Sequence, residues 1–415
     1  MSAHAEMLDL LQSREKNYSL PRHFYNDPAF YGADLDGIFH RRWLLAGFEC
    51  EIARPGDYLT LNVGRSSIVV LRDKADKVRA FFNTCRHRGS KICLAEKGNA
   101  KKLTCPYHQW TYNLDGKLFS AGRMHDEFDP STISLKAVSV ETLEGMIYIC
   151  LADEAPSFAP YRDALLPYLA PYELRNTKLA HSQVLVEKAN WKLVVENSRE
   201  CYHCTARHPE FVKTFFLDYR SPTLESDPKI VAFWDKCRSA GLPSGSEHGE
   251  DFQMDRLRFT EGALSITMDG KPAVAKRLGR APDWHIGTLR WEHFPSMFAH
   301  IFADYAFFFR LLPIGPEETL VTAKWLVHRD AEEGRDYDIQ NLIKVWSVTN
   351  EQDRDLVERN QEGVNSIGYQ PGPYSQRSER SVIKFSDWYS TTMLRHLGGP
   401  VRAASAGGRS GRALA

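Results

Sequence analysis

The sequence predicts an α+β protein of two domains, in which an all-β module precedes a domain of strands and helices. At 415 residues the chain is longer than one hydrophobic core usually supports. Short β-rich segments without intervening helices run from Asp57 to about Asp153, which favours an all-β module. Residues from about 330 to 365 carry many charges and few helix breakers, which predicts a long amphipathic helix in the second domain.

The expected elements follow one another in a simple order. Residues 1–44 form a helical lead-in and residues 45–160 the all-β module, with strands expected in DYLTLNV, SSIVVLRD, VRAFFNTC, LTCPYHQWTYN and GMIYICLAD. Asp115-Gly116 suits a tight hairpin turn. The Pro- and Tyr-containing stretch APSFAPYRDALLPYLAPYEL links this module to the second domain, residues 161–398. The tail, residues 399–415, is rich in Gly, Ala, Ser and Arg and is predicted to be disordered.

The second domain is expected to open with a strand and a helix. HSQVLVEKA alternates like a strand, and Asn190 is a suitable N-cap for a helix over WKLVVENSRECYH. Residues 305–328 predict two further strands.

Charge and hydropathy argue against several classes of partner. Lys plus Arg equals Asp plus Glu at 53 each, so there is no electrostatic reason to expect nucleic acid or an anionic membrane surface. No apolar run reaches the roughly 18 residues of a membrane span, and no secretory signal is visible. The prediction is a cytoplasmic protein, in which the 8 cysteines are not expected to serve as disulfide staples.

Four of the metal-binding side chains fall into two short, paired spacings. Cys85-Arg86-His87 is followed after 17 residues by Cys105-Pro106-Tyr107-His108. A structural zinc site uses the same ligand types, but zinc fingers usually group the cysteines in one half and the histidines in the other. Here each half supplies one Cys and one His, which suits a [2Fe–2S] cluster with both thiolates on one iron and both imidazoles on the other. Cys93, between the halves, is expected to be a buried thiol.

A second cluster of ligand types lies near residue 200. In a helix, Glu200 and His203 would face the same way, and Pro209 would bend the chain so that His208 returns toward His203. Two histidines and a carboxylate from elsewhere would form a facial triad with open iron positions. Two other interpretations compete: Cys201-x-x-Cys204 as a redox motif, and both histidines as structural residues.

The segments CRHRGSKIC and LTCPYHQWTYNLDG resemble the Rieske domain of ring-hydroxylating and related oxygenases, and Glu200-x₂-His203-x₄-His208 resembles the motif of their catalytic domains. The resemblance covers roughly residues 5–398. It implies a Rieske domain at 45–160 and a helix-grip catalytic domain, an antiparallel sheet with helices, at 161–398. It also implies that His203 and His208 bind a mononuclear Fe(II), with Asp353 as third ligand and Asp355 as the alternative.

The same resemblance implies that two subunits cooperate. Glu200 would connect the Rieske histidine of a neighbouring subunit to this iron, in a homotrimer. The wider family usually has Asp at this position, and Glu is typical of the branch that acts on quaternary amines. Because no G-x-G-x-x-G fingerprint follows a strand, electrons from NAD(P)H are expected through a separate flavin and iron–sulfur reductase.

The resemblance is closest to the branch that demethylates betaines, such as glycine betaine and proline betaine monooxygenases. These enzymes use O₂ and two electrons to hydroxylate an N-methyl group, which leaves as formaldehyde. A quaternary ammonium favours aromatic faces in a water-poor pocket, and the expected pocket residues are Trp291, Phe298, His300 and Tyr305. His300 or Arg310 would bind a substrate carboxylate. Where betaine demethylases tend to have Trp-Asn-His and then Asp-His, this chain has Phe298-Ala299-His300 and Asp304-Tyr305, which favours a bulkier or less polar betaine.

Two alternative functions remain at the level of sequence. The Phe-rich run at residues 307–309 is compatible with an aromatic ring-hydroxylating dioxygenase on the same scaffold. A zinc-stabilised binding or regulatory protein without redox activity would use the same Cys and His residues.

Overall fold

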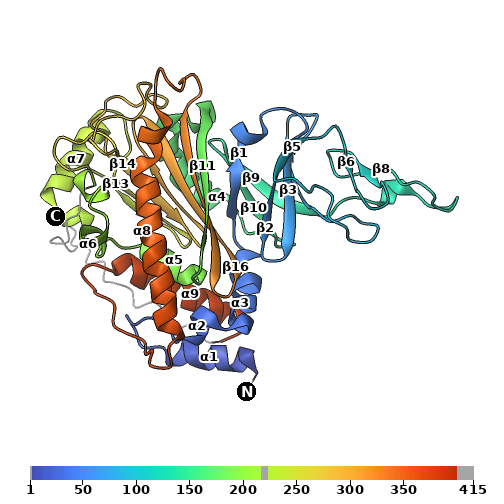
Figure 1. Ribbon diagram of the computed structural model, residues 1–415, viewed down its shortest axis with the longest axis horizontal. Coiled ribbons are helices and arrows are strands. Elements are labelled where there is room, and N and C mark those ends of the chain that lie inside the picture. The colour runs from blue at the N-terminus through green and yellow to red at the C-terminus, as the bar shows by residue number, and fades with distance from the viewer. Residues whose placement is uncertain (1, 216–222, 400–415) are drawn as a thin grey trace, which may run out of the picture.

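The computed structural model describes residues 2–215 and 223–399, and its strands form two seven-stranded antiparallel sheets and one small sheet of three strands. Figure 1 shows the two large sheets side by side, with the small sheet as an extension beyond the first of them. Helices gather around the second sheet. This arrangement agrees with the predicted α+β class.

The N-terminal sheet has the strand order β1-β10-β9-β4-β3-β2-β5, and the small sheet the order β6-β7-β8. Their bounds are β1 (Leu44–Phe48), β2 (Asp57–Val63), β3 (Ser66–Arg72), β4 (Val78–Phe82), β5 (Lys97–Asn99), β6 (Leu103–Thr104), β7 (Thr111–Tyr112), β8 (Leu118–Ser120), β9 (Ala137–Leu143) and β10 (Met146–Cys150). The turn between β7 and β8 is the expected one. The N–H of Gly116 donates to the carbonyl of Asn113 at 3.0 Å, and Gly116 has a φ of 90°, which glycine adopts without strain.

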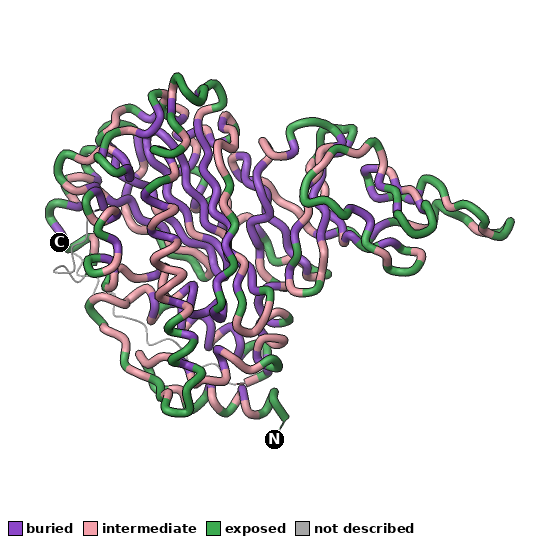
Figure 2. The backbone as a smooth tube through the Cα atoms, in the orientation of Figure 1, coloured by how far each residue is buried: buried purple, intermediate pink, exposed green. Residues whose placement is uncertain are grey.

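The second sheet has the order β11-β17-β16-β15-β14-β13-β12, and every neighbouring pair is antiparallel. Its strands are β11 (Thr177–Glu187), β12 (Ser246–His248), β13 (Phe252–Leu257), β14 (Thr288–His293), β15 (Met297–Ile301), β16 (Tyr305–Gly315) and β17 (Glu318–His328). The long hairpin β16–β17 occupies the region in which two strands were expected. Figure 2 shows these strands as a buried layer.

The helices are α1 (Ala3–Ser13), α2 (His23–Asn26), α3 (Pro28–Asp34), α4 (Ala159–Leu169), α5 (Trp191–Ser198), α6 (Cys204–Arg207), α7 (Pro228–Ser239), α8 (Ile339–Asn365) and α9 (Arg380–His396). Short η segments lie between helices or strands along the chain: η1 (Leu35–Phe39), η2 (Glu49–Ile52), η3 (Pro130–Thr132), η4 (Ala170–Tyr172), η5 (Leu174–Asn176), η6 (Phe211–Lys213) and η7 (Leu224–Ser226). Helix α8 lies across the second sheet (Figure 1). None of the helices in the described part of the chain is both long and apolar enough to cross a membrane.

The two faces of the second sheet pack against different partners because neighbouring residues of a strand point to opposite sides. Phe307 and Phe309 join a core that includes Trp191 of α5 and Trp346 of α8. Phe308, between them, joins a second core built with β1, β10 and α4. The N-terminal sheet and the second sheet therefore share a continuous apolar contact.

Three details differ from the sequence-based expectations. The helix expected through residue 203 ends at Ser198, although Asn190 does cap it by accepting from the N–H of Lys192. The long helix expected from about residue 330 begins at Ile339, where Asp338 is the N-cap. The expected linker contains α4, whose Leu165 and Leu169 are fully buried, so it is an integral packing element. The tail predicted to be disordered lies, from residue 400 onward, outside the described residues.

Candidate active site: a histidine–carboxylate triangle and a distant cysteine–histidine pair of loops

His203, His208 and Asp353 bring three ligand atoms together at one point. The Nε2 atoms of the two histidines are 3.1 Å apart, and the Oδ1 of Asp353 is 3.0 Å from that of His208 and 3.4 Å from that of His203. Ligand atoms about 2.1 Å from a metal, at right angles to one another, are about 3.0 Å apart. The triangle therefore has the size of one face of an octahedral metal site.

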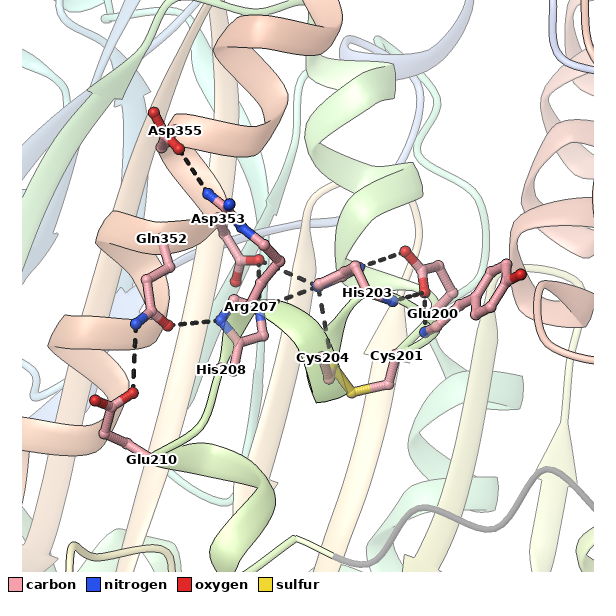
Figure 3. A network of polar contacts seen from close by, with 11 residues as sticks. Glu200, Cys201, His203, Cys204, Arg207, His208, Glu210, Gln352, Asp353 and Asp355 are labelled. Atoms are coloured by element: carbon pink, nitrogen blue, oxygen red, sulfur yellow. Dashed lines mark hydrogen bonds and ion pairs between the residues drawn. A yellow bond between two sulfur atoms is a disulfide. The ribbon is translucent and has the colours of Figure 1, made fainter.

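A hydrogen bond behind each imidazole turns its Nε2 toward the centre of the triangle. His203 Nδ1 lies 2.5 Å from Oε1 of Glu200, and His208 Nδ1 lies 2.7 Å from Oε1 of Gln352. Since a carboxylate and an amide oxygen only accept, each Nδ1 carries a proton, which leaves Nε2 as the nitrogen available to bind a metal. Both histidines are thus held in the tautomer that binds a metal (Figure 3).

The charge around the triangle favours a cation. Burial raises the pKa of Asp353, but its contacts with His203 and His208 outweigh that effect and hold the pKa below its ordinary value. Burial lowers the pKa of the His203 imidazole, while Asp353 and Glu200 together raise it to about 9. A positive charge at this point is stabilised by two carboxylates, so the donor set fits a divalent metal ion.

Asp355 and the Cys201–Cys204 pair lie beside the triangle without completing it. The carboxylate of Asp355 contacts Arg207 and Arg359, each at 2.8 Å, and points away from the histidines (Figure 3). Cys201 and Cys204, considered as a redox motif in a chain whose cysteines were not expected to serve as disulfide staples, form a disulfide. The sulfur of Cys204 is 3.9 Å from Nε2 of His203, farther than the oxygen of Asp353.

The helical argument that linked Glu200 to His203 is wrong, although the two side chains do meet. Both residues follow the end of α5, and the chain turns between them instead of continuing as a helix. Oε2 of Glu200 accepts from the backbone N–H groups of Tyr202 and His203, while Oε1 contacts the His203 ring. Glu200 therefore organises the turn itself.

The triangle opens into a cavity of about 400 Å³ bounded by the second sheet, α8 and the start of α9. Of the expected pocket residues, Phe298 and His300 line this cavity. Trp291 and Tyr305 do not. Trp291 points to the opposite face of β14, where its indole N–H donates to Tyr161 at 3.2 Å, because the cavity face is occupied by its neighbours Arg290 and Glu292. Tyr305 is buried behind the wall and accepts from the indole N–H of Trp346 at 2.9 Å.

Aromatic rings cover much of the cavity wall. Phe211 stacks on Phe215 and Phe298 on Phe309, each pair with centroids 4.7 Å apart. His300 lies 5.1 Å from the ring of Trp346, and burial holds its pKa well below the ordinary value, so its imidazole is neutral. This part of the wall therefore presents π faces together with a neutral imidazole.

Charged and polar residues of the cavity were not foreseen. Arg290 pairs with the buried Asp255 at 3.0 Å, and Arg199 pairs with Glu292. Residues of β14 alternate between the two faces of the sheet, and Arg290 and Glu292 flank a buried Trp. This alternation is the sequence signal that would have placed both charged residues on the cavity face. Arg310, considered for a substrate carboxylate, instead donates to the carbonyl of Ala46 at 2.7 Å, on the side of the N-terminal sheet.

The second set of predicted ligands lies on two loops of similar construction. In the first loop the N–H of Gly89 donates to the carbonyl of Cys85 at 2.9 Å, and in the second Gln109 donates to Cys105 at 3.1 Å. Gly89 and Gln109 both have positive φ, which reverses each chain four residues after its cysteine. Two equivalent turns thus present one cysteine and one histidine each.

The residues of these loops fit a [2Fe–2S] cluster. Cys85 and Cys105 are buried, the rings of His87 and His108 have centroids 4.6 Å apart, and His87 stacks on Trp110. Nδ1 of His87 is buried without a hydrogen-bond partner in the protein, as expected of an atom reserved for a ligand. Cys93 is buried close by, and its backbone is held by the Asn83 side chain.

The two predicted metal sites of one chain lie at opposite ends of the molecule. The loops belong to the extension with β6 and β8, whereas α6 lies on the far side of the second sheet (Figure 1). His108 is exposed on its loop, and Tyr202, beside Glu200, is 64% exposed. Each site therefore has one group that faces outward.

Comparisons with known proteins identify the family of both domains. The family model described as "Rieske [2Fe-2S] domain" matches residues 42–136, and "Ring hydroxylating alpha subunit (catalytic domain)" matches residues 174–395. The chain is 45% identical over 402 residues to a glycine betaine monooxygenase oxygenase subunit of Chromohalobacter salexigens, covering 94% of this chain and 89% of that protein. A protein of the same description from Pseudomonas aeruginosa is 45% identical over 400 residues, covering 94% and 92%.

Solved structures show the same fold. A quaternary ammonium Rieske monooxygenase, CntA, superimposes with a TM-score of 0.73 at 23% identity, covering 94% of this chain and 98% of the other. Naphthalene 1,2-dioxygenase from Rhodococcus sp. superimposes with a TM-score of 0.70 at 19% identity, over 94% and 98%. The fold is therefore common to relatives described with different substrates.

Proposed function

The chain belongs to the Rieske oxygenases, and we propose that it removes an N-methyl group from a quaternary ammonium compound of the betaine class. It is an oxygenase subunit with a Rieske [2Fe–2S] domain and a non-haem iron catalytic domain, and it receives electrons from a separate reductase. The observation that carries this proposal is the histidine–carboxylate triangle at the end of a cavity walled by aromatic rings. The near-full-length relatives described as glycine betaine monooxygenase oxygenase subunits support it.

The balanced reaction needs one O₂, two electrons and two protons for each methyl group. One oxygen atom enters the N-methyl group and the other leaves as water. The resulting carbinolamine loses formaldehyde, and the proton of its hydroxyl group goes to the tertiary amine that is released. The iron held by His203, His208 and Asp353 would supply the site of O₂ activation, and the cluster held by Cys85, His87, Cys105 and His108 would supply electrons.

The cavity wall suits the cationic head of such a substrate. The ring faces of Phe298, Phe309 and Trp346 attract a quaternary ammonium, which offers no hydrogen-bond donor. A neutral His300 beside them does not repel the positive charge.

The position of the two sites supports an assembly in which they belong to different subunits. Because the loops and the triangle of one chain lie at opposite ends (Figure 1), electrons would travel from His108 of one subunit to Glu200 of the next. Glu200 contacts the imidazole of His203, which would place it between the donor histidine and the iron. A head-to-tail homotrimer closes such a ring of identical contacts.

The electron supply and location that we propose follow from the same features. A flavin and iron–sulfur reductase would transfer electrons from NAD(P)H to the Rieske cluster, whose imidazole ligands raise its reduction potential. We place the chain in the cytoplasm, where NAD(P)H would be available to such a reductase.

The test is a substrate screen with purified oxygenase subunit and a surrogate reductase. Glycine betaine, proline betaine and carnitine are compared with choline and with aromatic acids, while O₂ uptake, formaldehyde and peroxide are measured. We expect formaldehyde and the demethylated amine in a 1:1 ratio with O₂ for at least one betaine. Formation of a dihydrodiol from an aromatic acid, without formaldehyde from any betaine, would replace the proposal by ring dihydroxylation.

A further inference from the structure

The Cys201–Cys204 disulfide encloses one of the proposed iron ligands. The two Cα atoms are 4.8 Å apart, and His203 lies within the loop that the disulfide closes. Figure 3 shows the sulfur bridge directly beside the His203 side chain. In the cytoplasm proposed above, disulfides are usually transient and catalytic or redox-sensing, so this pair requires an explanation other than stapling.

Cys201 and Cys204 are both among the residues that line the substrate cavity, although Cys204 is only 3% exposed overall. The Sγ of Cys204 is 3.9 Å from Nε2 of His203, the atom that faces the triangle. The ligand atoms of His203, Cys204 and His208 all lie within 4.8 Å of one another, a group that could hold a metal ion. A small molecule in the cavity thus meets the sulfur and the metal site together.

The state of Cys204 determines which set of donors surrounds the metal. In the disulfide, its sulfur is bonded to Cys201 and cannot act as a thiolate, so two imidazoles and one carboxylate remain, a set typical of Fe(II). In the dithiol, a soft sulfur donor lies beside the two imidazoles. Two nitrogens with sulfur and oxygen in four positions are typical of zinc, which prefers tetrahedral coordination.

We propose that Cys201 and Cys204 are a redox-active thiol site that selects the metal at the catalytic centre: the disulfide excludes Cys204 and favours Fe(II), and the dithiol adds Cys204 as a soft ligand and favours Zn²⁺. The proposal rests on the mononuclear metal site proposed above. It adds a function to two residues that the demethylation reaction does not use.

A peroxide in the cavity is the oxidant that closes the pair. One thiol reduces the peroxide to water and becomes a sulfenic acid, and the second thiol displaces hydroxide from it to form the disulfide and a second water. Overall, two thiols and hydrogen peroxide give one disulfide and two molecules of water, with two electrons passing from sulfur to oxygen. An exogenous dithiol reverses the step by exchange.

Single-cysteine variants separate the two states, since either substitution prevents the disulfide but only one leaves Cys204. In Cys201→Ser the Cys204 thiol is permanently free, whereas Cys204→Ser removes it. The full chain is kept with its Rieske cluster, the mononuclear metal is removed with a chelator, and Co²⁺ is added. X-ray absorption at the cobalt edge then reports the cobalt ligands without interference from the cluster iron.

We expect cobalt–sulfur scattering in Cys201→Ser and in dithiol-reduced wild type, and only nitrogen and oxygen ligands in peroxide-oxidised wild type and in Cys204→Ser. The zinc-to-iron ratio after loading with equal amounts of both metals should be at least 10-fold higher in Cys201→Ser than in Cys204→Ser. Absence of sulfur ligation in both Cys201→Ser and reduced wild type would overturn the proposal.

Two further outcomes bear on the proposal. Mass spectrometry after alkylation should find the disulfide in wild type treated with peroxide, and thiols that stay free would contradict the redox step. Cobalt that fails to bind any of the four samples would count against the metal site itself. That result differs from cobalt bound by nitrogen and oxygen alone in every sample, which would leave the metal site intact and refute only the role of the sulfurs.

Discussion

At the scale of single residues, the hydrogen bond at Nδ1 of each imidazole prepares His203 and His208 to bind a metal. An imidazole without a partner on Nδ1 exchanges between two tautomers, of which only one leaves Nε2 free to bind. Glu200 and Gln352 remove that choice for His203 and His208. The third corner of the triangle is the carboxylate of Asp353. The nearby Asp355 instead forms ion pairs with two arginines.

The two aspartates of α8 offer a matched pair of variants. Asp353→Ala removes one corner of the triangle and should weaken iron binding by at least about 100-fold, because even the loss of a group that only orients a ligand costs about 10- to 100-fold. Asp355→Ala breaks only the contacts with Arg207 and Arg359 and should keep its iron. Metal analysis of each protein, with the Rieske absorbance as a measure of folded subunit, checks this. Iron retained in Asp353→Ala and lost in Asp355→Ala would assign the ligand to Asp355 instead.

At the scale of elements, the active site depends on a helix that ends early. Asn190 caps α5, and its amide donates to the carbonyl of Pro316 at 2.7 Å, which ties the start of the helix to the second sheet. After Ser198 the helix stops, and Arg199 enters the cavity wall and pairs with Glu292. The chain is then free to place Glu200 and His203 on a turn, where one carboxylate contacts two backbone N–H groups and an imidazole.

The Glu200→Gln variant tests whether the negative charge of Glu200 is needed for electron transfer, or whether its side chain only holds the turn in place. The amide oxygen of Gln still accepts from the N–H groups of Tyr202 and His203, so both metals should stay bound. Without the negative charge, transfer from the Rieske cluster to the iron should slow by about 10- to 100-fold. Stopped-flow oxidation of the reduced cluster by O₂ and substrate measures that step, and its reduction by the reductase is the internal control. A variant that reoxidises at the rate of wild type would refute the proposed bridge.

At the scale of the whole molecule, a buried ion cluster joins the N-terminal sheet to the second sheet. Glu51 of η2 contacts Lys324 of β17 and Lys97 of β5, each at 2.6 Å. Burial raises the pKa of Glu51, but the two lysines outweigh it and hold the pKa below the ordinary value. A carboxyl group with a lowered pKa stabilises the folded protein above the pKa of the unfolded chain, and that stabilisation is lost as the pH falls through the folded pKa.

The Glu51→Gln variant should therefore differ most from wild type near neutral pH. Leaving Lys324 buried without its partner should cost about 3 kcal/mol at pH 7. As the pH is lowered toward and below about 4.3, the ordinary pKa of Glu, the wild type loses its advantage and the gap should narrow. Calorimetric Tm values of both proteins across this range check the sign. Glu49→Gln, which breaks a pair with Arg72 within the N-terminal domain, is the control, and a gap independent of pH would contradict the role of the Glu51 charge.

Much of the fold was accessible from periodicity alone. Alternating segments predicted the strands of both domains, and the charged run before residue 365 predicted most of α8. The end of α5 was not predictable from helix propensity, because VENSRECYH contains no residue that breaks a helix by itself. After Ser198, Arg199 pairs with the distant Glu292, and the Glu200 side chain accepts from the local N–H of His203 in place of a helical carbonyl.

By itself, the sequence determined the chemistry that depends on neighbours along the chain: one cysteine and one histidine on each of two loops, and Glu200, His203 and His208 within nine residues. Such short segments leave their side chains few ways to separate. Only the tertiary structure decided the rest. It brought Asp353 to His208 across 145 positions, turned Asp355, Trp291 and Arg310 away, and joined Cys201 to Cys204. Those outcomes depend on which face of a strand or helix meets the core, and packing, not spacing, settles that choice.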